Sequence, residues 1–288
     1  MNKLQMLVTD LDGTLLRSDK TVNPTTIDLI NNCVTNGMKF SIATGRSLVQ
    51  AYAILSCIDV KDEKYIIGCN GGFAYDVMKE KYLYISLFNS NVVEQVCKLF
   101  IQFQHANKEC SLELYITNKT HHEINESYIY ENSHGKLEAQ KHSKPNGMIA
   151  PSKTTFWTNI NELDKIKDSV IKIYFRSIES ATSNEFKEIL ASNNIEVTCS
   201  SSRSNNIEIN PKGVSKGYGV THLAKMLNVP ISNILTTGDG ENDISMLTAS
   251  GMSVTLTTSA ANVQQAAKKV IDVPQDIFVE SAIKEYLD

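Results

Sequence analysis

The stretch "MLVTDLDGTLL", residues 6–16, indicates the fold of this chain. Its apolar start predicts a short buried strand, which ends in two aspartates, Asp10 and Asp12, followed at once by Gly13 and Thr14. Two carboxylates this close repel each other. Because reactive groups of open α/β sheets gather beyond the carboxyl ends of strands, we expect this segment to contribute to a functional site.

The segments that follow alternate between helix and strand patterns. Asn23 is a candidate N-cap, Pro24 stands at the first helical position and Gly37 ends the pattern, so residues 23–37 are expected to form a helix. The further elements of this part are a strand running into a loop at 38–46, a helix at 47–56, a strand and turn at 64–72 and a hairpin at 73–85. This β-α-β-α-β order predicts a parallel sheet with right-handed crossovers.

Residues 88–206 differ in texture, being rich in Asn, Ser, Lys and Glu. Their expected strands and helices follow one another without a regular parallel pattern. After residue 206 the β/α rhythm returns and continues to the last helix. We therefore predict an α/β fold, in which a Rossmann-like parallel-sheet core of residues 1–87 and 207–288 carries an inserted α+β domain of residues 88–206.

The composition argues against several classes of protein. The net charge of −4 lacks the basic excess of a nucleic-acid-binding protein, and no stretch approaches the ~18 to 20 apolar residues that span a bilayer. The N-terminus lacks the apolar region of a signal peptide. Six scattered cysteines without a C-x-x-C pair are typical of reduced thiols. We expect a cytoplasmic protein without nucleic-acid or membrane partners.

Four segments are expected at the carboxyl ends of strands. They are "VTDLDGT" (8–14), "SIATGRS" (41–47), "PKGVSKG" (211–217) and "TTGDGENDISML" (236–247). A carboxylate can attack phosphorus and form an aspartyl-phosphate, provided that Mg²⁺ neutralises the phosphate charge. A second carboxyl group can protonate the leaving alkoxide. One aspartate for covalent bonding and one for proton transfer would explain the Asp-x-Asp pair, and the metal would relieve its repulsion.

The other segments offer complementary groups. Asp239 and Asp243 stand four residues apart near a predicted helix start, so both can face one point of a magnesium site. The Thr44 hydroxyl and the Gly45 amide can bind phosphate oxygens, and Lys216 supplies a positive charge for the same oxygens.

Each segment alone also has a structural interpretation. The D-x-D-G-T run could be a strand-to-turn connection, "GDGEND" a helix cap, and Lys216 a surface lysine. Arg46 could assist phosphate binding or stabilise its loop, and both alternatives stay open. The joint occurrence of the segments, each after a predicted strand, favours a common site.

The chain resembles the haloacid dehalogenase (HAD) superfamily, and more narrowly its Cof-type phosphatases, which have an inserted α+β (C2B-type) cap. The segments that carry this resemblance are "DLDGTLL" (10–16), "IATGR" (42–46), "NGG" (70–72), "PKGVSKG" (211–217) and "GDGENDISML" (238–247). The resemblance implies a HAD-like core and a Mg²⁺-dependent phosphatase that hydrolyses small phosphomonoesters, sugar phosphates or related metabolites, through an aspartyl-phosphate.

The resemblance also implies roles for single residues. The catalytic set would be Asp10, Asp12, Thr44 and Lys216, the substrate contacts Gly45, Arg46 and Asn242, and the magnesium site Asp10, Asp12, Asp239 and Asp243. Asp10 would be the nucleophile. Asp12 would be the general acid/base and would also give its backbone carbonyl to Mg²⁺. The partner would be a small phosphorylated metabolite, and the protein a monomer or weak homodimer.

Two runs depart from the family pattern. "GMSVTLTTSA" (251–260) replaces a run of small residues, and "PQDIFVE" (274–280) replaces "NDEDGV". Neither falls within the four segments, so we expect both to bear on substrate and cap closure and not on the reaction.

Two alternatives to a phosphatase remain at this stage. A mutase or other phosphotransferase would use the same core, and a non-catalytic sensor would only bind a phosphorylated metabolite. Other side chains are expected to be structural: His121, His122, His134 and His142 at the surface or in a polar loop, and Trp157 in the packing of the cap.

Overall fold

The chain folds into two compact units. The computed structural model describes residues 4–56, 58, 60, 63–106, 109–117, 126–130 and 153–287. The first unit comprises Met1–Arg46, Ile54–Ile85 and Val214–Asp288, and the second comprises Ser47–Ala53 and Ser86–Gly213.

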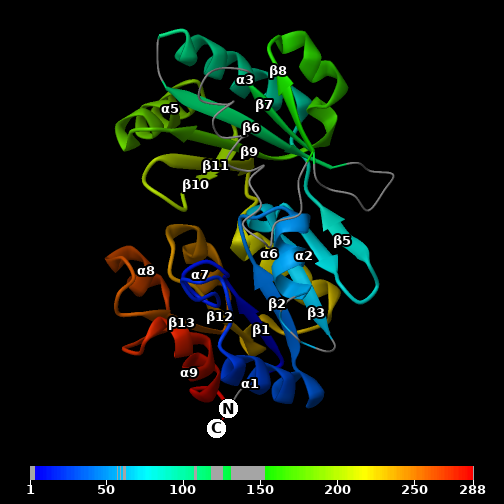
Figure 1. Cartoon of the computed structure of the whole chain (residues 1–288), viewed down its shortest axis with the longest axis vertical. Helices are drawn as coiled ribbons and strands as arrows, with labels where there is room; N and C mark the ends of the chain where they lie inside the picture. The colour runs from blue at the N-terminus through cyan, green and yellow to red at the C-terminus, as the bar shows by residue number, and fades with distance from the viewer. Residues whose placement is uncertain are drawn as a thin grey trace. The chain divides into compact units, whose positions relative to one another are not determined.

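The first unit contains an eight-stranded sheet in the order β14-β13-β12-β1-β2-β3-β4-β5 (Figure 1). Its strands are β1 (Met6–Thr9), β2 (Lys39–Ala43), β3 (Lys64–Gly68), β4 (Phe73–Asp76), β5 (Lys81–Ile85), β12 (Ile234–Thr237), β13 (Met252–Leu256) and β14 (Lys269–Ile271). The six strands from β14 to β3 pair in parallel, while β4 and β5 form an antiparallel hairpin. The predicted α/β parallel-sheet fold and its hairpin are confirmed.

Helices cover this sheet and so bury its faces, as is usual for parallel strands. They are α1 (Pro24–Thr35), α6 (Lys216–Met226), α7 (Ile244–Ala249), α8 (Ala261–Ala266) and α9 (Phe278–Lys284). Residues 48–53 of α2 (Leu48–Ser56) belong to the second unit. Val220 of α6 and Met246 of α7 share one apolar cluster with Met6 and Val8 of β1. Helices α1 and α9 pack against each other and contact β2 and β12 (Figure 1). None of the described helices is long and apolar enough to cross a membrane.

The first helix begins and ends as its sequence predicts. The Asn23 side chain accepts a hydrogen bond from the Thr25 amide, and Pro24 occupies the first helical position. Gly37 has a φ of +93°, a left-handed conformation that glycine adopts without strain.

The register of the central strands brings distant segments to one edge of the sheet. Thr9 of β1 pairs with Thr237 of β12 on one side and with Ile42 of β2 on the other. The amide of Asp10 continues this pairing by donating to the Thr237 carbonyl over 2.9 Å. The loops after β1, β2 and β12, which carry three of the four segments singled out in the sequence, therefore start side by side.

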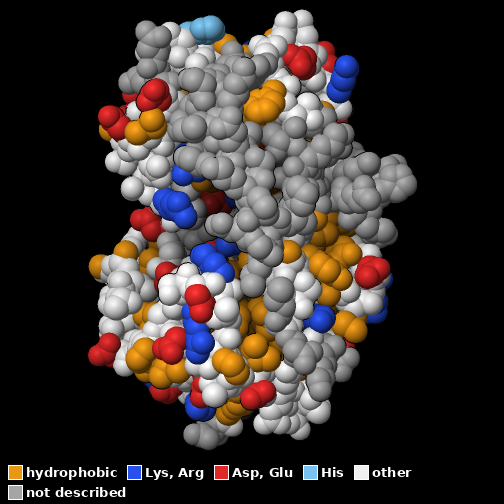
Figure 2. Space-filling view, in the orientation of Figure 1, with side chains coloured by type: hydrophobic (Ala, Val, Ile, Leu, Met, Phe, Trp, Pro, Cys, Tyr) orange, Lys and Arg blue, Asp and Glu red, His pale blue; other side chains and the backbone are white. Residues whose placement is uncertain are grey.

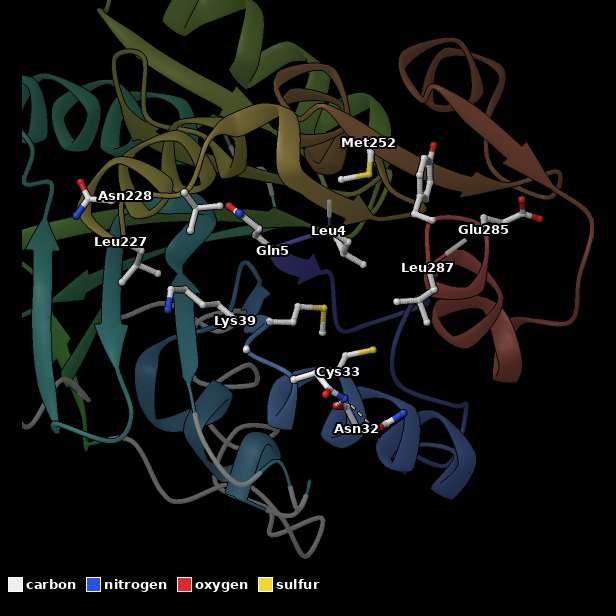
Figure 3. Close-up of a pocket in the computed structure, with 15 residues that line it drawn as sticks. Leu4, Gln5, Asn32, Cys33, Lys39, Leu227, Asn228, Met252, Glu285 and Leu287 are labelled. Carbon is white, nitrogen blue, oxygen red and sulfur yellow. Dashed lines mark hydrogen bonds between the residues drawn. The ribbon is translucent and has the colours of Figure 1, made fainter. Parts of the chain in front are cut away.

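The opposite edge of the sheet contains a cavity of about 1050 Å³ (Figure 3). It is lined by Gln5 just before β1, by Lys39 and Met252 at the starts of β2 and β13, and by Cys33 near the end of α1. These positions are the amino ends of the parallel strands. The cavity is therefore separate from the edge where the aspartates lie.

The second unit is built on a six-stranded sheet in the order β10-β11-β9-β6-β7-β8. Its elements are α3 (Ser90–Gln104), β6 (Cys110–Ile116), β7 (Glu126–Tyr130), β8 (Lys153–Trp157), β9 (Val170–Ser177), α5 (Ser180–Ser192), β10 (Val197–Ser200) and β11 (Asn206–Pro211). All of its pairs are antiparallel except β7 with β8. Phe100 of α3, Phe186 of α5 and Phe175 of β9 lie in its apolar core. Trp157 is 1% exposed in this core, which confirms its expected packing role.

One strand differs from its predicted assignment. Residues 207–211 were placed with the parallel core, but β11 pairs with β9 and β10, and the second unit continues to Gly213. Ile207 and Ile209 lie on the same face of β11, because alternate residues of a strand share a face, and both are buried in the core of the second unit. The strand therefore belongs to the sheet of that unit. His121, His122, His134 and His142 lie outside the described residues.

Candidate active site

A buried lysine joins two aspartates from distant parts of the chain. Lys216 is the first residue of α6, whose N-cap Ser215 accepts a hydrogen bond from the Tyr218 amide. Its Nζ lies 2.6 Å from Oδ1 of Asp10 and 2.6 Å from Oδ1 of Asp243, and its side chain is fully buried. Buried charges are costly unless they are paired, and here the charge of Lys216 is paired with both carboxylates. The predicted convergence of Asp10 and Lys216 is observed.

Three carboxylates meet at this point. Asp10, Asp239 and Asp243 each offer one oxygen within 4.8 Å of the others. Burial raises the pKa of Asp10 well above its usual value, and the neighbouring charge of Asp243 adds to the effect although Lys216 opposes it. Burial and Asp243 likewise raise the pKa of Asp239. An oxygen-only set with more negative than positive charge fits a divalent cation such as Mg²⁺.

Asp243 braces the loop that carries Asp239. Its Oδ2 accepts hydrogen bonds from the amides of Asp239 and Gly240 at 3.0 and 2.9 Å, while its Oδ1 accepts from Lys216. Asp243 therefore orients Asp239 besides adding charge to the site.

The loop after β1 also supports Asp239. The Thr14 hydroxyl donates to Oδ1 of Asp239 over 2.7 Å. Gly13 has a φ of +91°, and a Cβ at this position would lie 2.4 Å from Oδ2 of Asp239. Glycine is required here because the backbone approaches the carboxylate closely. Neither contact is predicted by the sequence, although Gly13 and Thr14 both stand within the motif at 10–16.

Asp12 has different partners from Asp10. Nε and Nη2 of Arg46 donate to its two carboxylate oxygens at 2.8 and 2.7 Å, and Lys20 Nζ lies 2.8 Å from Oδ1. Burial alone would raise the pKa of this carboxyl, but Arg46 and Lys20 together hold it well below its usual value. Separate cations thus relieve the repulsion between the two aspartates. Lys20 was not singled out in the sequence, and Arg46 contacts Asp12, which is consistent with its loop-stabilising alternative.

Replacing Arg46 by glutamine is expected to raise the pKa of Asp12 toward the usual aspartate value of about 4, because the carboxylate loses two charged hydrogen bonds. Carboxyl ¹³C NMR titration measures this change. The matched control is Lys39→Gln, which removes the cation paired with Glu63 elsewhere in the same unit and should leave Asp12 unaffected. An unchanged Asp12 pKa in Arg46→Gln would show that the ion pair does not control this carboxyl.

Two further predicted residues lie after strands of the same sheet: Thr44 after β2 and Asn242 after β12. Thr44 is 2% exposed, its hydroxyl accepts from the Arg46 amide at 3.2 Å and its carbonyl accepts from the Asn70 amide at 2.9 Å. The Asn242 side chain donates to Oδ1 of Asn70 over 3.4 Å. Asn70 is buried in a left-handed conformation, with φ 53° and ψ 43°. The "NGG" motif predicts no role for this asparagine, which links the Thr44 loop to Asn242.

Both departing runs contact the catalytic segments. The Thr255 hydroxyl donates to the Gly238 carbonyl at 2.7 Å, and the Gln275 amide donates to the carbonyls of Thr14 and Leu16 at 3.1 and 2.7 Å. The expectation that these runs bear on substrate and cap closure stays a prediction, and the structure adds that both contact the catalytic segments. Sequence position alone could not reveal contacts between loops that the sheet register brings together.

Comparisons with known proteins agree with this geometry. The family model described as haloacid dehalogenase-like hydrolase matches residues 7–282. The Bacillus subtilis protein 5-amino-6-(5-phospho-D-ribitylamino)uracil phosphatase YwtE is 24% identical over 259 residues, which are 86% of this chain and 86% of its own. A protein of Buchnera aphidicola subsp. Baizongia pistaciae, provisionally named a phosphatase, is 29% identical over 248 residues, covering 85% of this chain and 84% of its own.

Solved structures share the fold. BT4131, described as a HAD subclass IIB sugar phosphatase, superposes with a TM-score of 0.73 and 19% identity over 98% of both chains. BT1666 from Bacteroides thetaiotaomicron, described among the phosphatases of the HAD enzyme superfamily, gives a TM-score of 0.76 and 21% identity over 99% of this chain and 96% of its own.

Proposed function

The chain belongs to the haloacid dehalogenase-like hydrolases and is a phosphatase of that family, and on this premise we propose that it hydrolyses small phosphomonoesters through an aspartyl-phosphate on Asp10. The observation that carries the proposal is the buried cluster in which Lys216 bonds Asp10 and Asp243 beside Asp239. A single nucleophilic carboxylate held by a cation, next to a metal-binding set, is what attack on phosphorus requires.

The reaction takes place in two steps. A carboxylate oxygen of Asp10 attacks phosphorus as the bond to the ester oxygen breaks, and Asp12 gives a proton to the departing alkoxide. Water then attacks the phosphorus of the aspartyl-phosphate while Asp12 takes up its proton, which releases inorganic phosphate and restores Asp10. Lys216 stabilises the negative charge of the transferring phosphoryl group. The Thr44 hydroxyl, the Gly45 amide and the Asn242 side chain orient that group.

Asp12 must change its contacts during this cycle. In the structure its carboxylate is bound by Arg46 and Lys20 and is held in its ionised form. An acid needs a proton, so the first step requires the ion pair to loosen when the substrate phosphate enters and competes for these cations.

The residues present fit Mg²⁺ as the resident cofactor. Asp10, Asp239, Asp243 and the backbone carbonyl of Asp12 would hold it, and when bound it neutralises charge on the phosphate and on the three carboxylates.

Removal of divalent metal is expected to abolish turnover. With EDTA, phosphate release from p-nitrophenyl phosphate should fall by at least about 100-fold, because metal contributes several kcal/mol to such reactions and each 1.36 kcal/mol changes the rate about tenfold. Excess Mg²⁺ should restore the rate, whereas equal ionic strength from NaCl should not. Turnover that persists undiminished in EDTA would exclude the metal-dependent mechanism.

We infer that the substrate is a small phosphorylated metabolite, with sugar phosphates as the first class to test. Support comes from BT4131, which is described as a sugar phosphatase, and from YwtE, whose name gives a phosphorylated ribityl compound. On the face that Figure 2 shows, acidic and basic side chains of the described residues are interspersed, which does not favour a polyanionic partner. The five cysteines within the described part of the chain form no disulfide, as is typical of reduced thiols in the cytoplasm, the compartment that we propose. We also propose a monomer or weak homodimer.

One experiment tests the function and its alternatives together. The purified protein is incubated with a panel of phosphorylated metabolites, with and without Mg²⁺, and inorganic phosphate and isomeric products are both measured. A phosphatase releases phosphate in the Mg²⁺ arm. Formation of an isomeric sugar phosphate without phosphate release would identify a mutase, and tight binding without turnover would identify a sensor.

A further inference from the structure

We propose that Gln275 is a positioning residue for the metal site, acting through the loop that follows the two aspartates. This inference rests on the proposed function for its metal site. Gln275 belongs to the run "PQDIFVE", which departs from the pattern of the family that the chain resembles. No role for it followed from the sequence.

The contacts of Gln275 are specific to the catalytic loop. Its Nε2 donates to the Leu16 carbonyl at 2.7 Å and to the Thr14 carbonyl at 3.1 Å. One amide nitrogen has two hydrogens, so both can be used at once. Thr14 and Leu16 are 1% and 2% exposed, which leaves little water to replace these donors.

The loop that Gln275 holds supports a metal-binding carboxylate. The Thr14 hydroxyl donates to Oδ1 of Asp239, and Gly13 lies directly against the same carboxylate. A shift of the Thr14 backbone would therefore move or release Asp239. Groups that orient metal ligands commonly change metal affinity by about 10- to 100-fold when they are removed.

The segment that presents Gln275 is itself fixed. Gln275 is the first residue of the 3-10 turn Gln275–Ile277, which leads into α9. Phe278 and Val279 of α9 are buried in the core. The next carbonyl, that of Asp276, accepts a hydrogen bond from Asn23, the N-cap of α1. The C-terminal segment thus contacts the loop of residues 13–22 near both ends of that loop. Asp276 contacts Asn23 just after the loop, and Gln275 contacts Thr14 and Leu16 on the side of the metal site.

The test compares metal binding among matched variants. Mn²⁺, a paramagnetic substitute for Mg²⁺, is titrated into the full-length wild type, Gln275→Ala and Gln264→Ala, and free Mn²⁺ is measured by electron paramagnetic resonance. Gln264 is the control because its Nε2 also donates to two carbonyls, those of Thr257 and Ser259, at 2.9 and 2.7 Å. We expect about a 10-fold weaker Mn²⁺ affinity for Gln275→Ala and a change below about two-fold for Gln264→Ala.

Two further variants separate positioning from charge and from general stability. Gln275→Glu adds a negative charge, which by Coulomb attraction alone would tighten cation binding, yet a carboxylate facing two carbonyls cannot hold the loop, so we expect weaker binding than in the wild type. In the double variant with Thr14→Val, Gln275→Ala should cause less than about a two-fold further loss, because both act through one chain of contacts.

The outcomes are distinguishable. The positioning role would be overturned if Gln275→Ala bound Mn²⁺ with wild-type affinity, or if Gln275→Ala and Gln264→Ala lost Mn²⁺ affinity equally. If Gln275→Ala does not fold, Gln275→Met replaces it, because methionine keeps the length of the side chain without its donors. The same criteria then apply. A wild type that releases phosphate while Gln275→Ala binds Mn²⁺ normally would refute this inference and leave the function intact. If Gln275→Ala binds Mn²⁺ more weakly than the wild type, but the wild type releases no phosphate, this inference is supported and the proposed function is refuted.

Discussion

Replacing Asp10 by asparagine is expected to reduce phosphate release by at least about 1000-fold, and without loss of stability. The amide is a poor nucleophile, so the covalent step fails, as it does when other enzymes lose their nucleophile. Release of phosphate from p-nitrophenyl phosphate in Mg²⁺ measures the effect. The control is Asp28→Asn, which alters an exposed aspartate of α1. Turnover near the wild-type rate would refute the assignment of Asp10 as nucleophile.

The stability expectation for Asp10→Asn follows from its raised pKa. A folded-state pKa above the unfolded value means that the fold prefers the neutral carboxyl, so ionised Asp10 reduces stability once the pH rises above the unfolded value. A neutral amide of the same shape removes this cost. The melting temperature at pH 7 should therefore equal or exceed that of the wild type, and a marked decrease would show that the Lys216 ion pair outweighs the burial of Asp10.

Replacing Lys216 by methionine is expected to impair both activity and folding. Lys216 is buried against Asp10 and Asp243, so methionine would leave buried carboxylates without their cation, at a cost of about 3 to 5 kcal/mol in unfolding free energy. Thermal denaturation with and without Mg²⁺ measures the loss, and phosphate release should fall with it. Lys212→Met is the control, because Lys212 pairs with Glu196 at an exposed site.

A compensating change makes this prediction sharper. If the stability loss in Lys216→Met comes from uncompensated charge, adding Asp243→Asn removes one of the stranded carboxylates and should recover part of the melting temperature while activity stays low. No recovery would indicate that Lys216 stabilises the fold by packing and not through its charge.

Part of this site could be predicted because the physics of parallel sheets is regular. Short apolar runs ending in Asp10 and in "GD" at 238–239 mark strand ends, and parallel strands bring those ends to one edge. The convergence of Asp10 and Asp239 follows from that rule once the β/α order is known. Lys216 follows β11 of the other sheet and is the first residue of α6, so the rule does not account for it. The resemblance to a known family then supplied roles, which the geometry alone does not assign.

The remainder depended on contacts that leave no pattern in a sequence. Lys20 on Asp12 and Gln275 on Thr14 are contacts of single side chains in loops, where neither periodicity nor a motif applies. The alternation in β11 predicts a strand but not which sheet receives it, because either sheet offers an apolar face. At β14 a three-residue edge strand with one buried residue is too short to be recognised.

The pairing of β1 with β12 has a consequence for how this protein is made. A ribosome delivers Asp10 early, but Lys216 and Asp239 emerge only after the whole second unit has been synthesised. Until β12 emerges, one side of β1 lacks its neighbour, so the nascent chain exposes an unsatisfied strand edge. The continuous stretch from Ser86 to Gly213 meets no such delay, and the order of synthesis favours its completion before the catalytic aspartates ever meet.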